Sequence, residues 1–216
     1  MEDFVLNWNQ KKILKNVHFL DKFGIYLAGG TALSLHFGHR TSLDLDFYTK
    51  KHFKPEIVYK SFKKIFKGEK ISEPDIAENT LKFKINTTDL SFFRYPYPLI
   101  RDLVPFESVK LASPEDIIAM KTEAIITRGL KRDFVDIYFA TKKYGMKGIL
   151  NFYQEKFPHV YNEYKCLTAL TYFEDAEKGQ QGRKRIYIYS GVTWPKIKKF
   201  IVEEVKKYQL SLIKKK

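Results

Sequence analysis

The short segment Ser42–Tyr48 alternates polar and apolar side chains so regularly that it excludes a helix at this point. Successive side chains on a β-strand point to opposite faces, so a period of two predicts a half-buried strand. The same period places Asp44 and Asp46 side by side on the face away from the core. The apolar side chains expected to point into the core are Leu43, Leu45 and Phe47. The strand therefore belongs in a sheet with one apolar face and one face that carries two carboxylates.

The remaining patterns predict an α+β fold. In the first half of the chain they predict helices at 4–22, 31–37 and 55–66 and strands at 24–28, 81–86, 89–95 and 107–112. The first helix should bury Phe4, Trp8, Ile13, Val17 and Leu20. In the second half they predict helices at 114–128, 131–143, 149–157, 160–176 and 194–212, a loop at 178–185 and a frayed tail at 214–216. We therefore expect a mixed α/β core at 1–112 and a helical region at 113–216.

Composition narrows the class of protein further. The 216 residues include 39 Lys and Arg against 25 Asp and Glu, for a formal net charge of +14. This surplus favours polyanionic partners such as nucleic acid, although a generally lysine-rich surface would give the same count. The single cysteine, Cys166, excludes a disulfide framework within the chain. The acidic N-terminus and the lack of a long apolar stretch predict a cytoplasmic protein with no signal peptide and no membrane span.

The carboxylates of Asp44 and Asp46 indicate a metal site. Two adjacent carboxylates repel each other, and a divalent cation removes that cost. Hard oxygen ligands suit Mg²⁺ or Mn²⁺. A solvated polar face on an edge strand would give the same pattern, so the pair alone leaves both interpretations open.

The segment Gly29-Gly30-Thr31 follows the predicted strand at 24–28 and opens a predicted helix. Glycines let backbone N–H groups approach a ligand closely, and a helix N-terminus attracts anions. The Thr31 hydroxyl could add a hydrogen bond or cap the helix. The segment could therefore hold phosphate groups, and an ordinary strand-to-helix turn is the alternative.

The order of these elements resembles a known family. A strand, Gly-Gly-Thr, a short helix and a strand with Asp-x-Asp form the layout of the polymerase-β-like nucleotidyltransferases. The stretches Leu27–Ser34 and Arg40–Phe47 are similar to the AbiEii/AbiGii toxin branch of that superfamily. The resemblance implies a nucleotidyltransferase fold with a mixed sheet flanked by helices. It also implies that the helical C-terminal region completes the active-site cleft.

The resemblance also implies roles for individual residues. Asp44 and Asp46 would hold Mg²⁺ or Mn²⁺ and act as catalytic residues. The nucleoside triphosphate would contact Gly29, Gly30, Thr31, Arg40 and Ser42. Arg40 is expected there because the fork of its guanidinium group suits phosphate oxygens.

A second block, Lys121-x6-Arg128-x3-Arg132-Asp133-x2-Asp136, is also similar to the family. Offsets of 7, 11 and 15 residues would return to one face of a continuous helix. Gly129 could break that helix, and a tight turn could still bring the side chains together. Lys121 and Arg132 would then bind triphosphate oxygens, and Asp136 would orient Lys121 or the substrate. A surface ion-pair network is the alternative.

The sequence leaves the position of a third acid open. Many enzymes of this superfamily carry one on a neighbouring strand, where it takes the proton from the attacking hydroxyl. Ser91 stands near the expected position and Asp89 lies two residues earlier. A tight turn is predicted at 86–89, between the strands at 81–86 and 89–95. If the strand includes Asp89, the two residues share a face; if Asp89 belongs to that turn, it is too remote.

The expected function is transfer of a nucleoside monophosphate from a nucleoside triphosphate to an acceptor hydroxyl. The net charge favours RNA, such as a tRNA end, as the acceptor. By resemblance the protein would be the toxin of a toxin–antitoxin or phage-defence pair, with a cognate antitoxin as partner. The alternatives are an inactive nucleotide- or RNA-binding module of the same fold and a transferase that modifies a protein or a small molecule.

Overall fold

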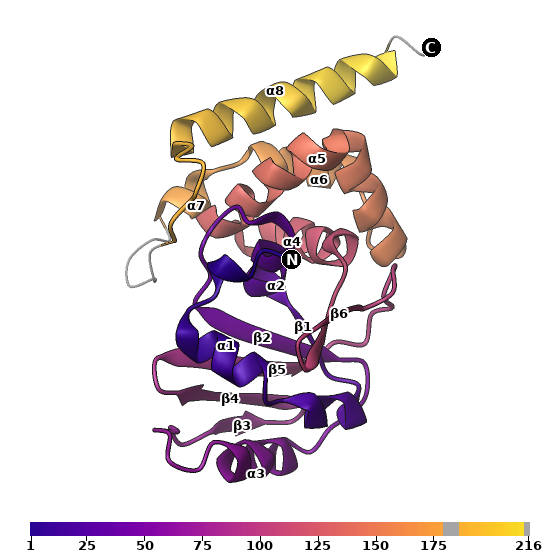
Figure 1. Ribbon diagram of the computed structural model, residues 1–216. Coiled ribbons are helices and arrows are strands. Elements are labelled where there is room, and N and C mark those ends of the chain that lie inside the picture. The colour runs from indigo at the N-terminus through magenta and orange to yellow at the C-terminus, as the bar shows by residue number, and fades with distance from the viewer. Residues whose placement is uncertain (179–185, 214–216) are drawn as a thin grey trace. The chain divides into compact units, whose positions relative to one another are not determined.

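The computed structural model describes residues 1–178 and 186–213. The loop predicted to follow residue 178 and the predicted tail at 214–216 lie outside the described residues. The chain divides into two compact units, Met1–Ser113 and Pro114–Lys216. The first unit combines a β-sheet with helices and the second is helical (Figure 1). The predicted α+β class with a helical C-terminal region is thus confirmed.

In the first unit the strands lie side by side in one mixed sheet. They are β1 (Tyr26–Ala28), β2 (Asp44–Thr49), β3 (Asp75–Ala77), β4 (Thr80–Ile85), β5 (Thr88–Arg94), β6 (Val104–Phe106) and β7 (Val109–Leu111). Among the described residues the sheet has seven strands in the order β3-β4-β5-β2-β1-β7-β6. The helices of this unit are η1 (Asp3–Val5), α1 (Trp8–Leu14), η2 (His18–Phe23), α2 (Gly29–Phe37) and α3 (Pro55–Ile65).

Helix α3 covers one face of the sheet, on the side of β3 and β4 (Figure 1). Phe62 of α3 is fully buried and packs edge-on against Phe83 of β4 and Phe92 of β5. Phe47 of β2 stacks on Phe92 with ring centroids 4.7 Å apart. Because side chains alternate along a strand, Asp44 and Asp46 lie on the opposite face of the same sheet.

The N-terminal segment differs from the single helix predicted at 4–22. Asn7 and Gln10 form a capping box, in which each side chain accepts a hydrogen bond from the backbone N–H of the other residue. This box starts α1 at Trp8, and Phe4 lies in the separate helix η1. Phe4 is 53% exposed and Trp8 is 71% exposed, so their predicted burial is wrong. The rest of the predicted stripe is buried, namely Ile13, Val17 and Leu20.

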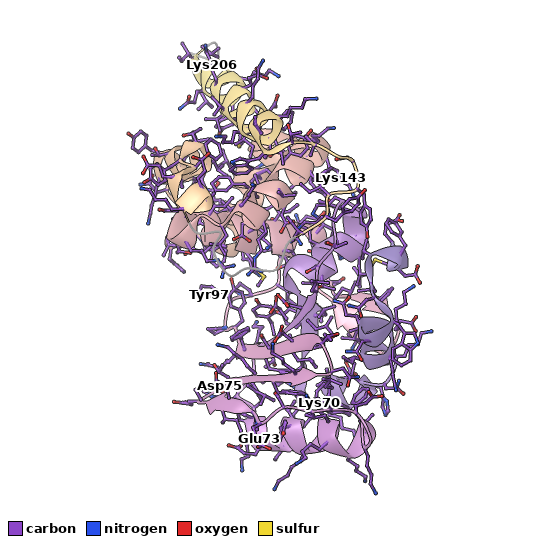
Figure 2. The ribbon with its side chains drawn as sticks, turned by 90° about the vertical axis from the view of Figure 1, so that its left-hand side faces the viewer. Lys70, Glu73, Asp75, Tyr97, Lys143 and Lys206 are labelled. Carbon is purple, nitrogen blue, oxygen red and sulfur yellow. The ribbon has the colours of Figure 1, made fainter. Side chains whose placement is uncertain are left out.

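One further expectation fails at the end of a strand, and two short strands were not predicted. Leu43 is 38% exposed because it precedes β2, where the pleat does not yet direct its side chain into the core. The sequence also gave no sign of β3 or β6, each of three residues. Strand β3 is exposed throughout and forms an edge of the sheet, where Asp75 and nearby Glu73 add charge (Figure 2). Charged side chains on an edge strand hinder pairing with another chain.

The second unit consists of α4 (Pro114–Arg128), α5 (Lys131–Lys156), α6 (Glu163–Thr171), α7 (Glu174–Lys178) and α8 (Trp194–Ile213). Gly129, with φ of +53°, ends α4 at the predicted place. Gly145, with φ of +68°, kinks α5 between the two helices predicted at 131–143 and 149–157. The helix predicted at 160–176 is divided into α6 and α7.

Helix α8 packs on α5 and α6 through Ile197, Ile201 and Val205. Within residues 1–178 and 186–213, no helix is long and apolar enough to cross a membrane.

Candidate active site

The central feature of the site is a set of acids on one face of β2 and β5. These strands run parallel, and their register sets Asp44 opposite Asp89 and Asp46 opposite Ser91. Asp44, Asp46 and Asp89 are all half-buried. Strand β5 begins at Thr88, so Asp89 lies in the strand and not in the preceding turn. All three carboxylates therefore point from the same face of two neighbouring strands.

The glycine loop lies directly against this acidic face. Gly29 has φ of +66°, and a Cβ atom there would be 2.8 Å from Oδ2 of Asp46. A Cβ atom at Gly30 would be 2.6 Å from Nη2 of Arg40 and 3.2 Å from Oγ of Ser42. Both positions therefore need glycine, since any larger side chain would displace a predicted site residue. The glycine loop therefore adjoins predicted metal-binding and phosphate-binding residues of this unit, namely Asp46, Arg40 and Ser42.

Helix α2 begins at Gly29, so the first-turn N–H groups of Gly29, Gly30 and Thr31 have no carbonyl partner within the helix. Such groups attract anions. The Thr31 hydroxyl does not cap the helix; it donates a hydrogen bond to the backbone carbonyl of Asp44. Its structural role is therefore to fix the glycine loop to the start of β2.

Arg40 is buried, with 1% of its surface exposed, and its Nη1 donates to the carbonyl of Thr41 at 2.9 Å. Its positive charge lies against Gly30. Ser42 is half-buried beside the same glycine. The guanidinium group of Arg40 thus lies beside the glycine loop.

A lysine that the sequence analysis did not single out pairs with the third acid. Lys84 of β4 lies opposite Asp89 in the sheet, and its Nζ is 2.9 Å from Oδ1 of Asp89. The pair is partly exposed, so solvent screens the attraction. The two-residue turn between β4 and β5 places Lys84 opposite Asp89. A prediction of that turn from the sequence would therefore have identified Lys84.

The arrangement of the carboxylates suits one kind of metal site. In the described part of the chain, no group of three or more His, Cys, Asp or Glu side chains converges as a metal cluster. Mg²⁺ typically takes one or two carboxylates and completes its octahedron with water and substrate phosphates. Asp44 and Asp46, on one strand face beside the glycine loop, fit that kind of site.

The residues of the second block come together within the helical unit. Nζ of Lys121, on α4, is 2.7 Å from Oδ1 of Asp133 and 2.9 Å from Oδ2 of Asp136, both on α5. Nε of Arg128 is 3.5 Å from Oδ2 of Asp133. The turn at Gly129 permits this convergence, which a straight helix could not produce at these offsets.

Burial distinguishes this network from a surface one. The side chains of Asp133 and Asp136 are fully buried and that of Lys121 is 8% exposed. Arg132, at the start of α5, is half-buried. Asp133 is a partner of Lys121 to which the sequence analysis assigned no role. Its place three residues before Asp136, on the same face of α5, was the available signal.

A glycine loop against paired carboxylates on a mixed sheet is the arrangement expected of a nucleotidyltransferase. Residues 12–186 match the model of the family described as nucleotidyl transferase AbiEii toxin, type IV toxin–antitoxin system. The chain belongs to this AbiEii nucleotidyltransferase toxin family, as the two sequence motifs predicted.

One protein of related sequence and two solved structures are similar to this chain. An uncharacterised protein of Aquifex aeolicus (strain VF5) is 33% identical over 191 residues, which cover 85% of this chain and 87% of that protein. A crystal structure of a proposed nucleotidyltransferase from H. pylori has a TM-score of 0.61 at 16% identity and covers 98% of this chain and 99% of its own. The nucleotidyltransferase toxin MenT4 from Mycobacterium tuberculosis H37Rv has a TM-score of 0.52 at 12% identity, with coverage of 90% and 80%. At these identities the two structures establish a shared fold.

Proposed function

We propose that this toxin-family nucleotidyltransferase transfers a nucleoside monophosphate from a nucleoside triphosphate to a hydroxyl group of RNA, such as a tRNA end. The observation that carries the proposal is the contact between Gly29 and Asp46, because it joins the phosphate-binding loop to the carboxylates. The net charge of +14 supports a polyanionic acceptor. A cognate antitoxin is the expected partner, since the family is that of type IV toxin–antitoxin systems.

In the proposed reaction, residues of this chain bind the nucleoside triphosphate, orient its phosphates and accept a proton. The N–H groups of Gly29, Gly30 and Thr31 bind the β- and γ-phosphates, and Arg40 and Ser42 reinforce that end of the site. Asp44 and Asp46 would hold Mg²⁺ or Mn²⁺, which when bound neutralises phosphate charge. The acceptor oxygen forms a bond to the α-phosphorus, and the bond to the bridging oxygen breaks. Pyrophosphate leaves with that electron pair, and Asp89 takes the hydroxyl proton.

The two regions have separate parts in this proposal. Residues 1–112 supply the glycine loop and the carboxylates. For residues 113–216, family resemblance supports phosphate binding by Lys121 and Arg132, with Asp136 orienting Lys121. The ion pairs of Lys121 with Asp133 and Asp136 support an orienting role for these carboxylates.

One observation favours a second candidate, a nucleotide-binding module without turnover. Nζ of Lys84 lies 2.9 Å from Oδ1 of Asp89, so it occupies a carboxylate oxygen that would otherwise be open to the acceptor hydroxyl. Such a module would bind nucleoside triphosphate with Mg²⁺ and would release no pyrophosphate.

The test is incubation of the purified chain with each of four α-labelled nucleoside triphosphates, Mg²⁺ and total cellular RNA. Asp44→Asn is the test variant, and Asp21→Asn, which alters a surface acid paired with Lys110, is the matched control. We expect label on a discrete RNA band with the wild type and the control and none with Asp44→Asn. Label transferred equally by Asp44→Asn would exclude the proposed acid pair. Nucleotide binding with no label and no pyrophosphate would favour the binding module.

A further inference from the structure

Aromatic side chains continue the face of β2 that carries the acids. Tyr48 is the next residue on that face after Asp46, which places it about 7 Å further along the strand. It lies opposite Tyr26 of β1 and Phe93 of β5. The chain runs from Tyr26 through Ala28, which is opposite Asp46, into the glycine loop. The aromatic residues and the glycine loop therefore lie on opposite sides of Asp46 along the sheet.

The rings form a connected group, here called the aromatic row: Tyr26, Tyr48, Phe93, Tyr95 and Tyr97. The Tyr48 ring centroid is 6.3 Å from that of Tyr26, 5.6 Å from that of Phe93 and 5.5 Å from that of Tyr95. Tyr97 adds a further ring 4.8 Å from Tyr95. These contacts hold the rings in place, so little side-chain freedom would be lost on binding a ligand.

Exposure distinguishes the aromatic row from the phenylalanine core on the other face. Phe62, Phe83 and Phe92 of that core are at most 4% exposed. In the aromatic row only Tyr26 is fully buried; Tyr48, Phe93 and Tyr95 are half-buried and Tyr97 is 43% exposed (Figure 2). The row thus has a buried base and rings that reach solvent, as a stacking surface requires.

Positive charge borders the aromatic row. Lys82 of β4 is exposed, lies on the same face as Asp46 and Ser91, and places its Nζ 6.0 Å from the centre of the Phe93 ring. Aromatic rings with a neighbouring cation suit single-stranded nucleic acid, because every base offers a π-face and every linkage a negative charge. Both features lie beside the carboxylates where the acceptor would react, which favours a nucleic-acid partner over a protein.

We infer that the aromatic row binds a nucleobase of the acceptor, the end of a single-stranded RNA, with Lys82 at its phosphate. This inference rests on the proposed function. In phosphoryl transfer the attacking and leaving oxygens lie roughly in line through the phosphorus. If pyrophosphate leaves from the glycine loop, which follows β1, the acceptor hydroxyl enters from the opposite side of Asp46, over β5. There Phe93 of the aromatic row lies on the same face and the same strand as Asp89, the proposed proton acceptor.

The test measures binding separately from turnover. A fluorescein-labelled ten-nucleotide single-stranded RNA is titrated with wild type, Tyr97→Ala, Tyr97→Phe and Lys82→Gln, with anisotropy as the readout. The matched control is Trp8→Ala, which removes an exposed ring that also has a lysine partner, Lys12, but lies on α1. Nucleoside triphosphate affinity is measured for each variant by calorimetry, and thermal melting checks that each one folds.

We expect Tyr97→Ala to weaken RNA binding about 5- to 100-fold, the range for loss of one base-stacking contact. Tyr97→Phe and Trp8→Ala should bind as the wild type does, and Lys82→Gln should reduce the salt dependence of binding by about one phosphate contact. An unchanged RNA affinity in Tyr97→Ala, or a loss of triphosphate affinity in place of RNA affinity, would overturn the inference. RNA binding that depends on Tyr97 without any transfer would contradict the proposed function while leaving the RNA site intact.

Discussion

The hydroxyl of Thr31 donates a hydrogen bond to the backbone carbonyl of Asp44, which joins the two motifs of the site by one side chain. Thr31 is 1% exposed, so Thr31→Val would keep the shape and remove a buried donor. We expect this variant to lose about 1–3 kcal/mol of unfolding free energy. Transferase activity should fall further than stability because the start of β2 is no longer fixed.

Urea unfolding and the labelled-nucleotide assay measure the two effects. Thr31→Ser is the control, since it keeps the hydroxyl and loses one methyl group, at a cost of about 1 kcal/mol. If Thr31→Val were as active as Thr31→Ser, the hydrogen bond would have no part in holding the site.

The contact of Gly29 with Asp46 leads to a second prediction. Gly29→Ala places a methyl group against the Asp46 carboxylate and forces an L-residue into φ of +66°. The backbone strain alone costs about 1–2 kcal/mol. Gly191→Ala has the same strain, with φ of +65°, and nothing within 4 Å of the new methyl group. We expect both variants to lose stability, Gly29→Ala the more because of the added clash, and only Gly29→Ala to lose nucleotide binding, with urea unfolding and calorimetry as the measurements. Equal nucleotide affinity in the two variants would contradict the proposed site.

The placement of Asp44 and Asp46 on one face of a strand was predictable from the sequence. A period of two is a property of the strand itself, so the alternation at 42–48 was enough to place Asp44 and Asp46 on one face. Leu43 follows the same alternation but is exposed, because the pattern does not show where the strand begins. The fold class and the helix ends at Gly129 and Gly145 followed from equally local signals.

What the sequence did not provide depends on register and tertiary contacts. The tight turn was predicted at 86–89, but β5 already begins at Thr88 and Asn86 takes the positive φ of +53°. That shift brings Asp89 into the strand opposite Lys84. In the N-terminal segment Asn7 and Gln10 have the spacing of a capping box, which starts a helix at Trp8. The apolar residues at helical spacing, which include Trp8, predicted instead a helix that begins earlier. Periodicity alone cannot show which of two overlapping signals prevails.

Asp89 gives a third prediction, because it lies opposite Asp44 and is proposed to take the proton of the attacking hydroxyl. Asp89→Asn should lower the transfer rate about 10²- to 10⁴-fold, the range for loss of a general base, with triphosphate affinity retained. Lys84→Gln removes only its ion-pair partner and should retain most of the activity. Single-turnover kinetics with saturating nucleotide separate the two effects. A full rate in Asp89→Asn would assign the proton transfer to another group.

The cysteine gives a prediction about pH. Burial raises the pKa of the Cys166 thiol to about 11, so the reactive thiolate is scarce in the folded state at pH 8. The fraction of thiolate in the folded protein should therefore rise only as pH approaches 11, whereas an unfolded thiol ionises near pH 8.5. We expect slow modification by iodoacetamide at pH 8 without denaturant and fast modification in urea. A variant with cysteine in place of Tyr164, which is 78% exposed, controls for reagent activity. Fast modification of native Cys166 would show that α6 opens readily.

The Lys121 network allows a comparison of two acids that differ in proposed role. Asp133 and Asp136 are both fully buried and both contact Nζ of Lys121. Removal of either charge leaves the buried ammonium with one partner fewer, and we expect about 3–5 kcal/mol of destabilisation in Asp133→Asn and in Asp136→Asn. Urea unfolding measures this loss, which a surface network would not produce.

The same two variants test whether the network also acts in phosphate binding. Asp136 is proposed to orient Lys121 toward the substrate, and Asp133 also pairs with Arg128. At a temperature where both variants are folded, Asp136→Asn should weaken triphosphate binding more than the equally destabilised Asp133→Asn. Unchanged nucleotide affinity and rate in both variants would mean that the network serves only to stabilise the junction of α4 with α5. Lys121 would then have no part in catalysis, and the carboxylates and glycine loop of the first unit would carry the proposed reaction without it.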